Sequence, residues 1–311
     1  MNENSPQTSP FMQILLKKVE TITGEYIKEI RSIDEDATQN KNFIVTTDSN
    51  TYFLKAYSEG SIDERTFELN ILRKLHNDGH AFPVRAATEP FVVEDRPVML
   101  FETVNGSTFD PHVSVSTEHL LTVASQLAQM HVSLSTFRVG EKKRFNALGF
   151  EFIDVFNLDT SDTIIKKALH MLRKAFADVN TDELLTTIIH DDISPHNVML
   201  SDNGELRFID FDDAHHSYRI SDIGTVVKEF IISPSETIDE DKISLFVHHY
   251  EATHNTPPLT EQEKLLLTPM VLRRALFMYA YYSMIEKERH LYLQSDDEYR
   301  IITALTLVKL K

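Results

Sequence analysis

The stretch "IIHDDISPHNVML", residues 188–200, holds a dense group of polar side chains between two apolar runs. The group comprises His190, Asp191, Asp192, His196 and Asn197. Pro195 lies inside it, and because proline breaks a helix interior, these residues are expected in a loop. A second run, "LRFIDFDDAHH" at 206–216, places Asp210 directly after a strand-like segment. Polar residues packed this densely beside apolar strands bind a metal, titrate in a reaction or form a surface turn.

The spacing of these residues suits phosphoryl transfer. That reaction needs an acid that orients a hydroxyl group, and oxygen ligands for Mg²⁺ that leave room for phosphates. The protein-kinase pattern H-x-D-x-x-x-x-N, followed by a second Asp at a strand end, supplies both. His190, Asp192 and Asn197 fill the first part and Asp210 the second. We therefore predict Asp192 as the catalytic residue and Asn197 and Asp210 as the metal ligands. The alternative is a polar turn followed by a surface hairpin.

A kinase also needs a lysine for the α and β phosphates of ATP, and a helix carboxylate that holds this lysine in place. Lys55 ends the apolar strand pattern "TYFLKAY", and Glu68 lies in the helix pattern that follows. Glu64 is the competing carboxylate. Glu68 is preferred because Leu72 and Leu75 follow it at one and two helical turns, which places it beside the buried face. A lone lysine in a strand is usually a surface residue, but its position before this helix and this loop favours a functional role.

Strand and helix signals divide the chain into two unequal parts. Residues 42–57 and 91–102 predict hairpins, with a helix at 61–79 between them. Later helix patterns lie at 116–134, 161–177, 181–189 and beyond 220, interrupted by a strand–turn–strand pattern at 197–212. The predicted fold class is α+β, with a small antiparallel-sheet N-terminal lobe carrying one helix and a larger, mainly helical C-terminal lobe.

The predicted boundaries follow from these patterns. They are a disordered tail at 1–10, an ATP-binding N-terminal lobe at 11–102, a hinge at 103–106, and a helical lobe with the loop and a substrate pocket at 107–311.

These motifs resemble the aminoglycoside phosphotransferase and choline kinase-like superfamily, from about Ile30 to Thr225. That superfamily shares the bilobal protein-kinase fold and phosphorylates small molecules. The resemblance implies an ATP- and Mg²⁺-dependent transfer of the γ-phosphate to a hydroxyl of an aminoglycoside, amino alcohol, homoserine-like amino acid or sugar. ATP would lie between the lobes, with its adenine against the backbone of Glu102 and Val104. Asp222 would bond the backbone of the catalytic loop.

Two departures from the family pattern stand out. The phosphate-covering loop is usually glycine-rich, but residues 34–45 contain no glycine, so Thr38, Asn40 and local N–H groups are expected to serve instead. Asp191 occupies a position where the family usually has glycine. A carboxylate beside the base would raise the pKa of its neighbour if it were unpaired. We therefore expect Asp191 to point away from Mg²⁺ or to pair with a cation.

Composition restricts the partners. The 311 residues include 41% hydrophobic and 25% charged residues, an ordinary globular composition, with a formal net charge of −17 and no cysteine. Strong negative charge disfavours nucleic acid, and the absence of cysteine excludes thiolate catalysis. No apolar run has the length of a membrane span, and the first ten residues lack the features of a signal peptide. The expected location is the cytoplasm, and the expected partner is a small hydroxylated acceptor.

Three other functions compete with this interpretation. His190–Asp191 matches the dipeptide of metal-dependent phosphohydrolases, in which the pair lies on helices. A kinase-like regulatory or nucleotide-binding module with weak turnover is the main alternative, favoured by the missing glycines. A protein kinase is disfavoured because the segment between Asp210 and Asp222 is short. Of the remaining histidines, His131 is predicted to pack in the core, and His215 and His216 are predicted at the surface.

Overall fold

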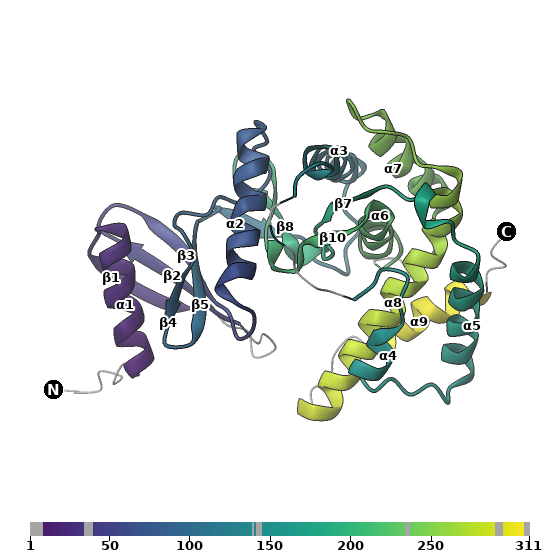
Figure 1. The fold of residues 1–311 in the computed structure, drawn as a ribbon, viewed down its shortest axis with the longest axis horizontal. Coiled ribbons are helices and arrows are strands. Elements are labelled where there is room, and N and C mark those ends of the chain that lie inside the picture. Colours follow the sequence, from purple (N-terminus) through teal and green to yellow (C-terminus); the bar gives the residue numbers. More distant parts are fainter. Residues whose placement is uncertain are drawn as a thin grey trace. The chain divides into compact units, whose positions relative to one another are not determined.

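The computed structural model describes residues 9–33, 40–138, 140, 145–233, 237–289 and 295–307. The chain separates into two compact units, Met1–Asn105 and Gly106–Lys311. Figure 1 shows a sheet with two helices in the first unit and a mainly helical second unit. No helix in the described ranges combines the length and the apolar character needed to cross a membrane.

The N-terminal unit is built on an antiparallel sheet of five strands in the order β1-β2-β3-β5-β4. The predicted hairpins are confirmed as β2–β3 and β4–β5, whereas the preceding strand was not predicted because its sequence, IKEIRS, is largely charged. The strands are β1 Ile27–Ser32, β2 Lys41–Thr47, β3 Thr51–Ala56, β4 Phe91–Val93 and β5 Arg96–Glu102.

Two helices cover the two faces of this sheet (Figure 1). Helix α1, Pro10–Thr23, begins within the stretch expected as a tail, where Ser9 caps its first turn. Its Leu15 and Val19 share a core with Leu54 of β3. Because side chains alternate along a strand, Lys55 points to the opposite face, which α2, Ile62–Asn77, covers.

The C-terminal unit is mainly helical. Its helices are α3 Thr117–Leu134, α4 Glu151–Val155, α5 Thr163–Ala177, α6 Arg219–Val226, α7 Glu240–Ala252, α8 Glu261–Arg289 and α9 Ser295–Leu307. Helix α6 continues into a π-helical turn, η4, over Val227–Ile232. Thr260 and Glu263 form a capping box at the start of α8, in which each side chain accepts a hydrogen bond from the backbone N–H of the other.

Two small sheets carry the loops of interest. In one, β7 (Thr186–Ile189) pairs with β10 (His215–Tyr218); in the other, β8 (Val198–Ser201) lies between β6 (Gly106–Thr108) and β9 (Leu206–Phe208). The prediction of a helix over 181–189 is therefore wrong. Only a 3₁₀ turn forms, at Thr181–Glu183. The β-branched run of β7 favours a strand, and β10 supplies its partner.

Candidate active site

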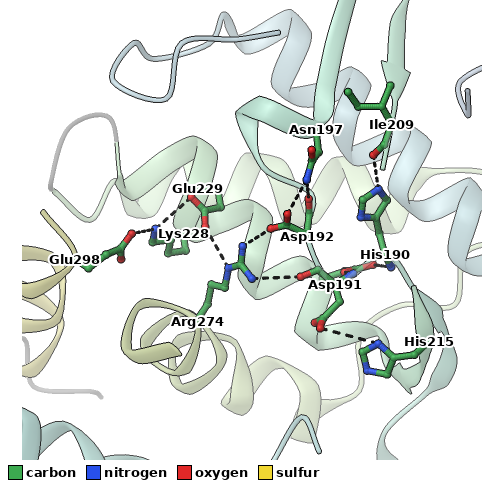
Figure 2. A network of polar contacts seen from close by, with 11 residues as sticks. His190, Asp191, Asp192, Asn197, Ile209, His215, Lys228, Glu229, Arg274 and Glu298 are labelled. Carbon is green, nitrogen blue, oxygen red and sulfur yellow. Dashed lines mark hydrogen bonds and ion pairs between the residues drawn. The ribbon is translucent and has the colours of Figure 1, made fainter. Parts of the chain in front are cut away.

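The loop over residues 190–197 presents Asp192 from a tight turn. The Ser194 N–H donates to the Asp192 carbonyl at 2.9 Å, and the Asn197 N–H donates to the Ser194 carbonyl at 2.9 Å. The side-chain amide of Asn197 donates to the Asp192 carbonyl at 2.9 Å and to Asp192 Oδ2 at 2.6 Å. With its nitrogen engaged in this way, Asn197 directs Oδ1 away from Asp192 (Figure 2).

Asp210 comes to the same place through the β8–β9 hairpin. The Ile209 N–H donates to the Asn197 carbonyl at 3.0 Å, so the residue that precedes β8 and the residues that follow β9 lie at one end of the hairpin. Asp210 adopts a left-handed backbone conformation with φ of 63°. An amide oxygen and a carboxylate at one hairpin end are hard oxygen donors, which fits a site for Mg²⁺. The structure thus brings together Asp192, Asn197 and Asp210.

The buried side chain of His190 connects the loop to the residue that follows β9. Its imidazole is fully buried, with Nε2 at 3.0 Å from the Ile209 carbonyl and its ring 4.5 Å from the ring of Phe211. The residue follows strand β7, and neither it nor Asp191 lies on a helix. This position does not match the phosphohydrolase alternative, in which the pair lies on helices.

Asp222 clamps the backbone of the loop, as the resemblance implied. Its two carboxylate oxygens accept the N–H groups of His190 and Asp191, each at 2.8 Å, and His131 Nε2 lies 3.1 Å from Oδ2. Burial alone would raise the pKa of this carboxyl, but the bond with His131 and the nearby His190 outweigh burial and lower it. His131 is buried, as predicted, and its second ring nitrogen bonds Tyr250 at 2.8 Å.

The backbone conformation of Asp191 accounts for the glycine that the family usually has at this position. Its φ is 67°, a left-handed conformation that glycine adopts freely and that aspartate tolerates better than most residues. Its Oδ2 lies 4.0 Å from His215 Nδ1, and burial raises the pKa of the carboxyl. The surface position predicted for His215 is wrong: pairing with β7 leaves the residue only 4% exposed. The expected cationic partner of Asp191 is therefore a histidine, when that histidine is protonated.

Arg274 of α8 is the main site residue that sequence reasoning did not place. Its guanidinium forms an ion pair with Asp192 Oδ1, donates to the Asp191 carbonyl at 3.4 Å and contacts Glu229 Oε1 at 3.2 Å (Figure 2). The Asp192 carboxylate is consequently held at both oxygens, by Asn197 and by Arg274. The signal in the sequence was the pair "RR" inside an otherwise apolar helix pattern.

A pocket opens beside this loop within the C-terminal unit. Its walls include Asp191, His215, Ser221, Arg273, Arg274 and Phe277. Arg273 is 8% exposed and donates to the carbonyls of Asn146 at 2.7 Å and Gly149 at 3.4 Å. Among the described residues it pairs with no carboxylate, and burial lowers the pKa of its guanidinium. The pocket therefore contains a cation suited to an anionic group.

Lys55 and Glu68 meet around Tyr57 in the N-terminal unit. All three side chains are buried. Lys55 Nζ lies 5.0 Å from the centre of the Tyr57 ring, and the Tyr57 hydroxyl donates to Glu68 Oε2 at 3.0 Å. Arg65 donates to the same oxygen at 3.2 Å. Tyr57 and Arg65, which sequence reasoning did not select, complete this buried cluster.

The remaining predicted nucleotide contacts also lie in the N-terminal unit. The Glu102 N–H donates to the Arg85 carbonyl at 2.9 Å, whereas the Val104 N–H bonds no other backbone group of the described residues. The Asn40 side-chain oxygen accepts from the Ser58 N–H at 3.0 Å, which ties the segment before β2 to the end of β3. Thr38 lies outside the described residues.

Known small-molecule kinases are similar to this chain in sequence or in fold. Homoserine kinase from Janthinobacterium sp. (strain Marseille) is 23% identical over 249 residues, which span 76% of this chain and 75% of that protein. The crystal structure of choline kinase LicA from Streptococcus pneumoniae matches with a TM-score of 0.69 and 16% identity, over 95% of this chain and 99% of that one. Amicoumacin kinase hAmiN, solved in complex with AMP-PNP, Ca²⁺ and Ami, matches with a TM-score of 0.72 and 15% identity, over 94% and 92%.

The structural matches confirm the predicted fold class. The model of the phosphotransferase enzyme family matches residues 29–252, a span that contains both the Lys55 cluster and the 190–197 loop. The chain therefore belongs to the phosphotransferase enzyme family.

Proposed function

We propose that this phosphotransferase moves the γ-phosphate of ATP, bound with Mg²⁺, to the hydroxyl of a small molecule. The observation that carries the proposal is the arrangement of Asp192, Asn197 and Asp210 at one end of the β8–β9 hairpin. Asp192 is the residue that accepts the hydroxyl proton. Because Asn197 and Arg274 hold its two oxygens, its direction is set before the substrate arrives, and such positioning supplies much of the catalysis of phosphoryl transfer.

The other predicted residues receive roles in binding. Asn197 Oδ1 and Asp210 would hold Mg²⁺, which supplies neutralisation of phosphate charge when bound. Lys55, placed by the cluster around Tyr57 and Glu68, would meet the α and β phosphates. The Glu102 carbonyl and the Val104 N–H would bind adenine, because the Glu102 N–H already has a partner.

The acceptor we favour is a hydroxylated amino acid of the homoserine type. The curated relatives are named homoserine kinases, and the pocket beside Asp192 carries complementary charges. Arg273 would receive a carboxylate, Asp191 an ammonium group, and Phe277 the short aliphatic part. Aminoglycosides, amino alcohols and sugars are the competing acceptors.

ATP consumption with an acceptor panel tests the proposal. The panel contains homoserine, choline, spectinomycin and a hexose, with the Asp192→Asn variant beside the wild type. We expect turnover with homoserine and its loss in the variant, while a thermal shift with ATP and Mg²⁺ persists in both. Asp202→Asn, in the exposed turn between β8 and β9, is the matched control and should keep wild-type turnover.

Two results would contradict this proposal. Wild-type turnover in Asp192→Asn would remove Asp192 from catalysis. A thermal shift with Mg²⁺ and ATP but no turnover on any acceptor would instead support the alternative of a nucleotide-binding module.

A further inference from the structure

A chain of alternating charges runs from Asp192 into the interior of the C-terminal unit (Figure 2). Arg274 bridges Asp192 and Glu229, and Lys228 Nζ contacts Glu229 Oε2 at 3.2 Å. The same Nζ forms an ion pair with Glu298 Oε1 near the start of α9. This charge chain thus joins three carboxylates through two cations, from Asp192 to Glu298.

Two successive residues of the π-helical turn η4, Lys228 and Glu229, both enter this charge chain. Neighbouring residues of an α-helix face different directions, so they rarely share one buried contact. Both residues are buried here, at 2% and 8% exposure, because helix α6 and η4 are enclosed on all sides. Such π-helical irregularities occur often at functional sites.

Burial of these charges carries a cost that packing alone does not require. A buried ion pair is often no more stable than apolar residues of the same volume. Glu298 is 4% exposed, and its Oε2 has no hydrogen-bond partner among the described residues. Burial, with the repulsion of Glu229, raises its pKa to about 7, although Lys228 opposes the shift. An interior built only for stability would place apolar side chains here.

We propose that Lys228 and Glu298 are positioning residues for phosphoryl transfer, acting through Glu229 and Arg274 on the direction of the Asp192 carboxylate. Lys228, held by Glu298, fixes one oxygen of Glu229, and the other oxygen fixes Arg274 Nε. Arg274 then reaches the 190–197 loop at two points, Asp192 Oδ1 and the Asp191 carbonyl. Without Lys228 and Glu298, Arg274 is the one partner that this charge chain leaves to Glu229, and the two side chains can rotate together.

The test removes the deeper pair as a unit. Lys228→Met combined with Glu298→Gln deletes one cation and one carboxylate, so no isolated new charge is buried. We expect kcat to fall about tenfold, with the KM for ATP within about twofold of the wild type, because a small misdirection of the acid affects the chemical step most. The single variant Lys228→Arg retains the cation and should keep most of the wild-type kcat.

A matched control separates positioning from stability. Arg219 and Glu263 form another buried ion pair of the C-terminal unit, at 2.7 Å, with no contact to Arg274. Glu263→Gln should lower the unfolding temperature and keep the wild-type kcat when both proteins are assayed well below their transitions. An unchanged kcat in the Lys228/Glu298 double variant would overturn the inference and leave the chain a packing element.

The kinetic arm rests on the proposed function, so a second readout works without turnover. The Asn197 side-chain amide donates to Asp192 Oδ2 and therefore reports its direction through its NMR resonance. In the ligand-free protein this resonance should shift in the Lys228/Glu298 double variant and stay in place in Glu263→Gln. A wild type that phosphorylates no acceptor would refute the proposed function, whereas an unshifted resonance in the double variant would refute the positioning chain.

Discussion

The side-chain amide nitrogen of Asn197 lies 2.6 Å from Asp192 Oδ2. One residue thereby joins the predicted base to the predicted metal site, since its nitrogen holds Asp192 and its oxygen points elsewhere (Figure 2). Substitutions at this position can separate the two roles.

Asn197→Asp should keep metal binding and lose catalysis. A carboxylate still offers an oxygen to Mg²⁺, but it repels Asp192 and donates no hydrogen bond. We expect kcat to fall about 100-fold with little change in the Mg²⁺ concentration required, whereas Asn197→Ala should lose both. Steady-state kinetics over a Mg²⁺ titration measure this, with Asn203→Ala in the exposed β8–β9 turn as the control. Equal metal requirements for both Asn197 variants would contradict the assignment.

Asp191→Gly should fold well and keep most of kcat, with a higher KM for homoserine because its ammonium group would lose this carboxylate. At φ of 67° glycine is unstrained, while alanine in the left-handed region costs about 1 kcal/mol or more. Asp191→Ala should therefore be less stable than Asp191→Gly by about 1 kcal/mol, as measured by urea denaturation. A loss of turnover in Asp191→Gly as deep as that in Asp192→Asn would show that the carboxylate takes part in the chemistry.

The ionisation of Asp222 should make the free energy of unfolding depend on pH. Its pKa is lowered on folding, so its contribution is complete above the ordinary value of 3.8 and disappears as the pH falls through the lower folded value. Asp222→Asn should lose about 3 kcal/mol of unfolding free energy near neutral pH, because asparagine replaces one of the two acceptor oxygens with an NH2 donor and leaves one buried N–H group without its acceptor. Denaturation at pH 7 and pH 3 should show a smaller difference in unfolding free energy between the wild type and Asp222→Asn in acid. An equal difference in unfolding free energy at both pH values would exclude the ionised Asp222 carboxylate as its source.

Arg273 should select acceptors that carry a carboxylate. The comparison is homoserine against 3-aminopropan-1-ol, which keeps the amine and hydroxyl and lacks the carboxylate. Arg273→Met should reduce the ratio of their kcat/KM values at least about tenfold, the effect of one charge-assisted hydrogen bond. The control is Arg300→Gln, whose side chain is largely exposed on α9. An unchanged ratio would assign carboxylate recognition to another residue.

Tyr57→Phe should weaken nucleotide use without touching the C-terminal unit. The change removes the 3.0 Å bond from Tyr57 to Glu68, an oxygen that Arg65 also contacts at 3.2 Å, and so alters the buried cluster around Lys55. We expect the KM for ATP to rise severalfold and stability to fall by about 1–2 kcal/mol. Tyr52→Phe on β3, the strand that Tyr57 follows, removes a bond to Glu25 and should leave that KM unchanged. Equal KM values in the two variants would exclude Tyr57 from the nucleotide site.

The parts of the site that sequence could predict are local. Asp192 and Asn197 are five residues apart, and a single hairpin brings Asp210 to them, so spacing and turn signals suffice. Arg274 lies 82 residues from Asp192, and nothing in the pattern of α8 shows which carboxylate it meets. His215 was misplaced for a related reason: its burial depends on the pairing of β10 with β7, and the latter was read as helix.

Helix α9 bears on how this protein can be altered. Glu298 enters the charge chain from α9, a helix that carries none of the sequence motifs of the predicted site. If the charge chain positions Asp192 as proposed, a truncation before Ser295, or a fusion partner that strains this helix, would lower turnover even though every motif residue remained intact. Engineering of the carboxyl end should be scored by turnover as well as by yield.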